Sequence, residues 1–190
     1  WIELLKAENV AESTTLEIEK DIERLQTITD RFSKIGSEPK LEMQDIIAAT
    51  QETFDYLQSR FSKQVVFSFQ APKIPVFVLF NATLHSWTIE NLVKNAIDAM
   101  KGKGNLDLVI EQEGDWVKIK VSDTGSGIPK KQFKMIFEPG FTTKKRGWGL
   151  GLSLTKRIVE EYHKGLIKVV QSEIGKGSTI QLSYKKSESV

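Results

Sequence analysis

Two glycine clusters carry the clearest chemical signal in the sequence. The first is 123–128 (DTGSGI), the second is 147–152 (GWGLGL), and a lysine-rich loop separates them. Glycine lets the backbone approach a ligand closely and permits positive φ. The second cluster leads into a helical pattern, so we expect its glycines at a helix N-terminus, where free N–H groups and the helix dipole attract phosphate.

The charges around these glycines favour the same chemistry. Asp123 ends an alternating apolar pattern typical of a strand, where a carboxylate can fix one polar edge of a ligand. The basic residues of the loop are Lys130, Lys131, Lys134, Lys144, Lys145 and Arg146. Together these features predict a nucleotide site, with a structural loop as the alternative. The P-loop motif is absent, as is a Gly-x-Gly-x-x-Gly motif after a strand, which argues against a P-loop protein and a dinucleotide fold.

A polar stripe lies in the helical pattern over 81–100. Asn91, Asn95 and Asp98 are spaced i, i+4 and i+7, so they share one helix face. Asparagine is a poor helix former, which makes this repetition notable. Amide oxygens suit Mg²⁺, which keeps several waters and bridges phosphates. We expect the stripe to bind a ligand; a solvated helix face is the alternative. The core-facing positions are Leu92, Val93, Ala96 and Ile97.

Length and composition narrow the class of protein. The chain has 190 residues, 39% hydrophobic and 27% charged, as in one globular domain with or without an appendage. The net charge of +2 predicts no nucleic-acid partner and no membrane-surface binding. The absence of cysteine excludes disulfides and cysteine-bound zinc. No apolar run could span a bilayer, and the chain begins at Trp1, so we expect a piece whose membrane segment, if any, lies upstream.

Helical and strand patterns alternate after residue 40. Helices are expected over 45–61, 81–100 and 149–163, and strands over 65–69, 76–80, 106–113, 116–122, 166–171 and 179–184. Turns at 114–115 and 175–177 predict two hairpins, hence a mixed or antiparallel sheet with helices on one face. The predicted fold class is α+β, a two-layer α/β sandwich.

An amphipathic pattern precedes this sandwich. From Ile18 to Phe32 apolar residues recur at alternating spacings of four and three, which is typical of a heptad seam. Such a seam requires a partner, so we expect a homodimer that forms a four-helix bundle; a helix packed on the domain is the alternative. The turn at 36–39 is the predicted boundary. The predicted organisation is a helical segment at 1–38, a main domain at 39–186 and a tail at 187–190.

The motifs together resemble those of the ATP-binding catalytic domain of bacterial sensor histidine kinases, in the GHKL superfamily with its Bergerat fold. In chain order they are similar to the N box at 91–96 (NLVKNA), the first glycine box at 123–128, the F box of the ATP lid at 137–144 (FEPGFTTK), the second glycine box at 147–152 and the last glycine box at 175–179 (GKGST). The match covers 41–184. Each box is weak alone, but their order and spacing are specific.

The resemblance implies a role for each matching position. It implies Mg²⁺ on Asn91 and Asn95, catalytic roles for Asn95 and Lys144, and an adenine-selecting hydrogen bond to Asp123. The lid, 128–146, would order on ATP. The ATP-binding positions that it implies are Asn91, Asn95, Asp98, Asp123, Gly125, Gly127, Ile128, Thr142, Thr143, Lys144, Gly147, Gly149, Leu150, Gly151, Leu152 and Thr179.

The resemblance also implies that 1–38 belongs to the dimerisation and histidine-phosphotransfer hairpin. The hairpin's His-Glu-x-x-x-Pro type acceptor box is absent, and we expect His85 and His163 in capping or surface positions. The implied function is transfer of the γ-phosphoryl group of Mg-ATP to a histidine upstream of Trp1, and then to an aspartate of a response-regulator receiver domain, in the cytoplasm. This chain alone is not expected to autophosphorylate.

Three departures keep other functions open. ATPases of the superfamily carry a glutamate one helical turn before the metal-binding asparagine, where this chain has Asn91; Glu90 lies about 100° away around the helix. The missing base favours phosphoryl transfer over hydrolysis. Trp148, between two glycines, and Asp98 also depart from the usual residues of the family. A GHKL ATPase, a serine protein kinase and a degenerate ATP-sensing scaffold are the alternatives.

Overall fold

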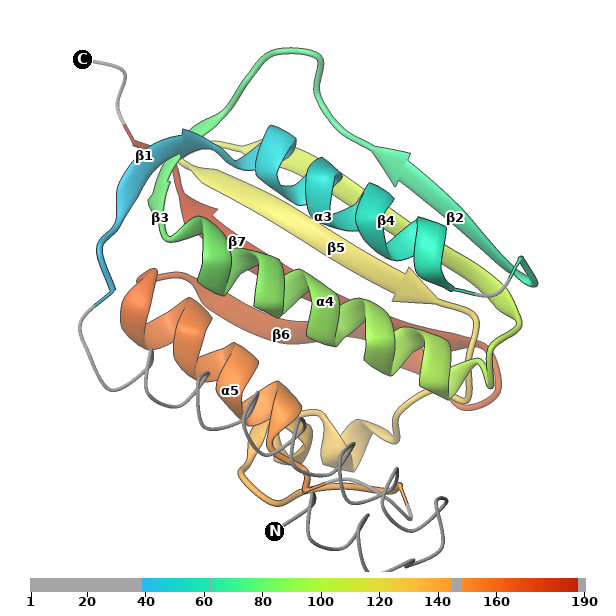
Figure 1. Cartoon of the computed structure of the whole chain (residues 1–190). Coiled ribbons are helices and arrows are strands. Elements are labelled where there is room, and N and C mark those ends of the chain that lie inside the picture. The colour runs from blue at the N-terminus through green and yellow to red at the C-terminus, as the bar shows by residue number, and fades with distance from the viewer. Residues whose placement is uncertain (1–38, 62, 145–147, 188–190) are drawn as a thin grey trace, which may run out of the picture. The chain divides into compact units, whose positions relative to one another are not determined.

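The computed structural model describes residues 39–61, 63–144 and 148–187 (Figure 1). The chain divides into two compact units, Trp1–Pro39 and Lys40–Val190, and the second carries the fold described here. The predicted dimerisation segment at 1–38 lies outside the described residues, as do Lys145, Arg146, Gly147 and the last three residues of the predicted tail.

A five-stranded mixed sheet forms one layer, in the order β2-β4-β5-β7-β6. The strands are β2 (Val65–Gln70), β4 (Gly104–Glu113), β5 (Trp116–Asp123), β6 (Leu166–Glu173) and β7 (Gly177–Lys185). β2 pairs with β4 in parallel, and all other neighbours are antiparallel. Both predicted hairpins, β4–β5 and β6–β7, are confirmed.

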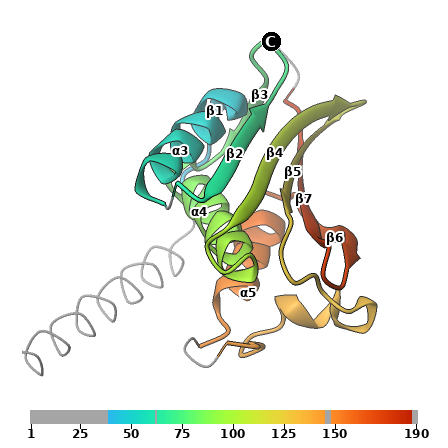
Figure 2. The same ribbon diagram turned by 90° about the vertical axis from the view of Figure 1, so that its right-hand side faces the viewer.

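Helices form the second layer, on one face of the sheet (Figure 2). They are α3 (Ile46–Arg60), α4 (Ala82–Ala99) and α5 (Gly151–Arg157), the last continuing as a π-helical turn over Ile158–Tyr162. Apolar side chains of α3 and α4 meet the inward-facing residues of β4, β5 and β7, among them Leu106, Ile119 and Leu182, which are all 0% exposed. The predicted two-layer α/β sandwich is confirmed. None of the helices among the described residues has a stretch long and apolar enough to cross a bilayer.

A second, two-stranded sheet was not fully predicted. β1 (Glu42–Asp45) pairs antiparallel with β3 (Phe77–Phe80), so the residues before α3 are a strand. Its four residues are too few for a recognisable alternation, and its partner lies more than thirty positions away in the sequence. The lid loop also contains two short 3₁₀ helices, Lys130–Gln132 and Met135–Phe137.

The long helices begin with side-chain caps. At α3, the Asp45 carboxylate accepts hydrogen bonds from the backbone N–H groups of Ile47 (3.1 Å) and Val76 (3.0 Å). At α4, the Asn81 Oδ1 accepts from the Leu84 N–H (3.0 Å). These caps satisfy donors that the first helical turn leaves free. At α5, the N-cap residue Leu150 provides no such bond.

Both histidines are buried, which corrects the expectation of surface positions, whereas the alternative expectation of a capping position holds for His163, the C-cap residue of the π-helical turn. His85, on α4, is 0% exposed; its Nε2 lies 2.8 Å from the Thr50 hydroxyl and its Nδ1 lies 3.1 Å from the Tyr184 hydroxyl. His163 is 6% exposed, and its Nε2 accepts a hydrogen bond from the Asn81 N–H (3.1 Å). Burial lowers the pKa of His85 to about 3 and that of His163 to about 4, so both are neutral at pH 7.

Candidate functional site

The polar stripe of α4 lies on the helix face opposite to the core. Asn91 and Asn95 are half-buried and Asp98 is exposed. The predicted core-facing residues of the same helix turns are no more than 7% exposed: Leu92, Val93, Ala96 and Ile97. The helical period therefore separates a packing face from a face that is free to meet a ligand.

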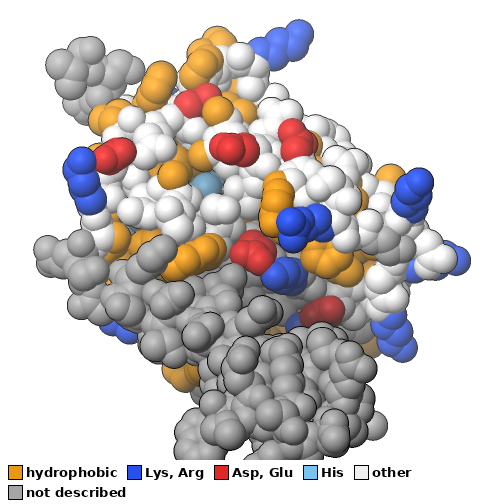
Figure 3. Space-filling view, viewed as in Figure 1, with side chains coloured by type: hydrophobic (Ala, Val, Ile, Leu, Met, Phe, Trp, Pro, Cys, Tyr) orange, Lys and Arg blue, Asp and Glu red, His pale blue; other side chains and the backbone are white. Residues whose placement is uncertain are grey.

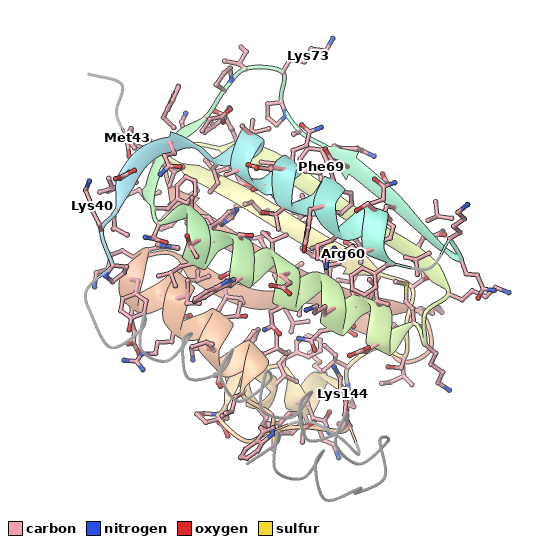
Figure 4. All side chains as sticks on the ribbon, in the orientation of Figure 1. Lys40, Met43, Arg60, Phe69, Lys73 and Lys144 are labelled. Atoms are coloured by element: carbon pink, nitrogen blue, oxygen red, sulfur yellow. The ribbon has the colours of Figure 1, made fainter. Side chains whose placement is uncertain are left out.

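Lys144 of the lid reaches this stripe. Its Nζ lies 2.9 Å from Asn95 Oδ1 and 2.5 Å from Asp98 Oδ2, so one ammonium group bridges two oxygens on neighbouring helix positions. Figure 4 labels Lys144 at the lid, below the C-terminal half of α4. The contact joins residues 46 positions apart or more, and it closes the loop between the glycine clusters onto α4.

Asp123 lies at the end of β5, opposite Ser178 of β7. Its Oδ1 accepts a hydrogen bond from the Gly125 N–H (2.7 Å). Burial raises the pKa of the Asp123 carboxyl above its ordinary value, while backbone N–H groups of Gly125 and Ser178 act in the opposite direction. A partly desolvated carboxylate of this kind is a strong and directional acceptor.

The segment after Asp123 is fastened to two parts of the fold. The Ser126 N–H donates to the Ala99 carbonyl at the end of α4 (3.1 Å), and the Ser126 carbonyl accepts from the Gly175 N–H in the β6–β7 turn (2.9 Å). Gly127 has φ +72°, and a Cβ there would lie 2.2 Å from the Glu173 carbonyl oxygen. Only glycine fits this position, and the packing holds the segment after Asp123 against the end of α4.

The second glycine cluster joins the lid to α5 and α4. The Gly140 N–H donates to the Gly149 carbonyl (3.1 Å), which closes the base of the lid. A Cβ on Gly151, the first residue of α5, would lie 2.5 Å from Asn91 Oδ1. The Asn91 amide nitrogen donates to the Thr155 hydroxyl (2.7 Å). Asn91 therefore packs directly against the first turn of α5, whose N–H groups lack a side-chain cap.

The other predicted site residues fall into three groups. Gly125, Gly127 and Ile128 lie in the loop that follows Asp123, where the Ile128 N–H donates to the Ser172 hydroxyl (2.7 Å). Thr142 and Thr143 are exposed on the lid, and the Thr142 hydroxyl accepts from the Lys144 N–H (3.1 Å). Leu150 and Leu152 are half-buried at the start of α5, and Gly149 precedes them. Gly147 lies outside the described residues.

Thr179 does not join the group around Asp123, contrary to the sequence-based expectation. It pairs with Ser122, and their hydroxyls lie 2.9 Å apart. Because neighbouring strand residues point to opposite faces, Thr179 lies on the face away from the helices, and Ser178 lies on the face of Asp123. Strand alternation from buried Leu182 and Tyr184 places Ser178, rather than Thr179, on the sheet face of Asp123.

Charge on the helix side of the domain is mixed. Figure 3 shows acidic and basic side chains interspersed over the described part of that face. Within the described residues, no group of three or more His, Asp or Glu side chains could hold a metal ion. The donors at the stripe, an amide and a carboxylate, instead suit a hard ion that keeps waters and bridges phosphates. Trp148 is 66% exposed, so its ring is not packed over the site.

A protein-family model described as "Histidine kinase-, DNA gyrase B-, and HSP90-like ATPase" matches residues 85–188. The sensor histidine kinase ZraS of Escherichia coli (strain K12) is 47% identical over 92 residues, which are 48% of this chain and 19% of ZraS. The nitrogen regulation protein NtrY of Azorhizobium caulinodans is 29% identical over 167 residues, which are 83% of this chain and 21% of NtrY. The chain thus spans about a fifth of the length of these relatives.

Solved structures agree on the fold. The nucleotide-free catalytic domain of histidine kinase ThkA superposes with a TM-score of 0.69 at 27% identity, covering 77% of this chain and 95% of that domain. ThkA in complex with the response regulator protein TrrA gives a TM-score of 0.75 at 24% identity, covering 94% of this chain and 52% of that chain.

Proposed function

Because the chain belongs to the family of histidine kinase-, DNA gyrase B- and HSP90-like ATPases, we propose that it is the ATP-binding kinase core of a two-component sensor histidine kinase. The observation that carries the proposal is that two other motifs contact α4: Asn91 bonds to Thr155 of α5, whose start is uncapped, and Ser126, after Asp123, bonds to the Ala99 carbonyl. Named relatives such as ZraS support the kinase assignment within this family.

Each part of the site has a task in this proposal. Asp123 accepts a hydrogen bond from the amino group of adenine and thereby selects adenine over guanine. Ser178 lies beside Asp123 on the same face of the sheet. The α5 N-terminus, from Gly149 to Leu152, binds phosphate oxygens through backbone N–H groups. Asn91 positions that turn through its contacts with Gly151 and Thr155.

Mg²⁺ fits the donors of this site, with Asn95 and Asn91 as the proposed protein ligands. When bound with nucleotide, it supplies charge neutralisation at the phosphates. Lys144, Thr142 and Thr143 lie on the lid and would meet the phosphates there. Because phosphoryl transfer chiefly requires positioning and charge neutralisation, these groups are sufficient when an external imidazole is the nucleophile.

The phospho-acceptor histidine and the protein partners concern the whole protein rather than this chain alone. Neither His85 nor His163 is accessible, which argues against either as phospho-acceptor. We propose a histidine on a separate phosphotransfer helix, a homodimer formed through such helices, and onward transfer to a receiver-domain aspartate. The complex of ThkA with TrrA supports a receiver-domain partner. A kinase that uses ATP in this way works on the cytoplasmic side.

Hydrolysis of ATP is the main alternative. The position that would carry the water-activating base holds Asn91, and Glu90 forms an ion pair with Lys94 one turn along α4. No carboxylate within the described residues of the stripe precedes Asn95 by one turn, which favours transfer. A serine protein kinase or an ATP-sensing scaffold would share the same nucleotide site.

Calorimetric titration with a non-hydrolysable ATP analogue, with and without Mg²⁺, tests the proposal. The wild-type chain is expected to bind in a Mg²⁺-dependent manner. Asp123→Asn should bind at least about a hundredfold more weakly, because an amide presents a donor to the adenine amino group. Asp107→Asn, on the outer face of β4, is the matched control and should bind normally. Absence of wild-type binding would contradict the proposal and indicate a degenerate scaffold that binds no ATP. Rapid release of ADP from ATP without an acceptor would indicate an ATPase.

A further inference from the structure

We propose that Asp98 is a direct ligand of the nucleotide's metal ion, together with Asn95, and that the Lys144 ammonium occupies this metal position until Mg-nucleotide binds. The inference rests on the proposed function, because it concerns the metal of the same ATP site. It assigns a metal-binding role to Asp98, for which the sequence motifs implied only a position in the ATP site.

The geometry of the stripe already accommodates a cation. Asn95 and Asp98 are three positions apart on α4, so their side chains project from one helix face. Their oxygens lie 2.9 Å and 2.5 Å from one ammonium nitrogen. Two oxygens that converge on one charged nitrogen are arranged to converge on a small metal ion as well. The ammonium is therefore a stand-in ion at this position.

The donor chemistry distinguishes Asp98 from the other candidate. Mg²⁺ is usually held by one or two carboxylates together with substrate phosphates and waters. Asn95 is neutral, so Asp98 is the residue of this pair that supplies a formal negative charge. Asn91, the other proposed ligand, is neutral as well, and its amide nitrogen donates to the Thr155 hydroxyl (2.7 Å).

The lysine contact is weak enough to be exchanged. The side chains of Lys144 and Asp98 are 43% and 57% exposed, and exposed ion pairs contribute little to stability. A divalent ion interacts more strongly with the same carboxylate, and it repels an ammonium group at the same position. The displaced Lys144 remains on the lid, where its charge can turn to the phosphates. Metal binding and lid movement are thereby coupled.

The test measures how much Mg²⁺ is needed for binding, independently of activity. Calorimetric titrations of the non-hydrolysable ATP analogue at a series of Mg²⁺ concentrations give a half-maximal Mg²⁺ concentration. Asp98→Asn should raise this midpoint about tenfold, because the carboxylate charge is lost. Its affinity for the analogue in EDTA should stay the same or improve, since a negative charge facing the phosphates is removed. Asp55→Asn, an exposed acid on α3, makes the same charge change elsewhere and should keep the wild-type midpoint.

A second variant tests the stand-in role of the lysine. Mn²⁺ binding without nucleotide, followed by the electron paramagnetic resonance signal of free Mn²⁺, should tighten about threefold in Lys144→Met, because the competing ammonium is gone. Lys134→Met, elsewhere on the lid, should leave the Mn²⁺ affinity unchanged. Asp98→Asn should weaken Mn²⁺ binding.

The outcomes separate this inference from the proposed function. A wild-type Mg²⁺ midpoint in Asp98→Asn, with normal binding of the analogue by the wild-type chain, would overturn the inference and leave the kinase proposal standing. Unchanged or weaker Mn²⁺ binding in Lys144→Met would overturn the stand-in role. If the wild-type chain bound no analogue at any Mg²⁺ concentration, the proposed function would fail and this inference with it.

Discussion

α4 carries a polar cluster toward each end, and the two are built in opposite ways. Near its start, His85 is fully buried and bonded to Thr50 of α3 and Tyr184 of β7. Near its end, Asn95 and Asp98 share a single exposed lysine from a loop. The first cluster joins three elements of the core permanently, and the second is held by a contact that a ligand can replace. Burial with complete pairing marks a structural role, whereas exposure with an exchangeable partner marks a ligand site.

The largest expected difference between the two clusters is their response to acid. His85 and His163 have folded pKa values of about 3 and about 4, below the unfolded value of about 6.5, so the unfolded chain binds more protons below pH 6.5. Stability is therefore full above pH 6.5 and falls as the pH drops toward 4. Between pH 7 and pH 5 the free energy of unfolding should fall by about 2 kcal/mol for each histidine. Urea unfolding at both pH values measures this loss.

A single-histidine variant provides the control for the acid effect. His163→Phe keeps an aromatic ring against Phe80 and Tyr184 but removes one titrating group. Its loss of stability between pH 7 and pH 5 should be about half that of the wild-type chain. A wild-type stability that stays constant over this interval would contradict the assignment of both rings as buried and neutral.

A smaller effect is expected when one partner of the buried cluster is removed. Tyr184→Phe leaves His85 Nδ1 without its hydrogen bond in a fully buried site. The free energy of unfolding should fall by about 1–3 kcal/mol, which is the cost of an unsatisfied buried polar group. Affinity for the ATP analogue in the folded variant should remain that of the wild-type chain.

The matching change at the other cluster should show the opposite pattern. Asn95→Ala removes a half-exposed amide, so the free energy of unfolding should stay within about 0.5 kcal/mol of wild type. Mg²⁺-dependent binding of the analogue should be lost. A large loss of stability with normal nucleotide binding would reverse the roles assigned to the two clusters.

A small gain in stability is expected at the start of α5. Leu150 has a helical backbone (φ −97°, ψ −15°), so Leu150→Asp does not form the side-chain cap seen at α3 and α4. Its carboxylate lies at the positive end of the helix dipole and should raise the free energy of unfolding by about 0.3–1 kcal/mol. The new carboxylate would repel phosphate, so affinity for the ATP analogue should fall. Leu150→Ala adds no charge and serves as the control. Unchanged affinity in Leu150→Asp would remove this helix start from the proposed phosphate site.

Sequence patterns predicted the features that depend on near neighbours. Alternation between core and solvent predicted the β4–β5 and β6–β7 hairpins, and the 3.6-residue period separated the two faces of α4 correctly. The motif identified glycines that pack against the backbone, such as Gly127, although the sequence could not show that Glu173 is its neighbour. These patterns depend on residues close together in the sequence, so they can be recognised without a tertiary structure.

Features that depend on distant contacts were missed or misplaced. β1 is defined by its pairing with β3, and the burial of His85 is defined by Thr50 and Tyr184, which lie on other elements. The last glycine box predicted Thr179 at the site, because a motif does not reveal which face of a strand a residue occupies. A shift of one position reverses that face.

By itself, the sequence determined the family motifs, the two-layer sandwich and the residue types able to bind a nucleotide and its metal. The tertiary structure decided which of those residues meet. It set Ser178 beside Asp123, packed Asn91 against Gly151, and brought Lys144 to Asn95 and Asp98. The physical reason is that side-chain chemistry and local periodicity are written along the chain, whereas the contacts of a loop lysine arise only when helices, strands and loops pack together.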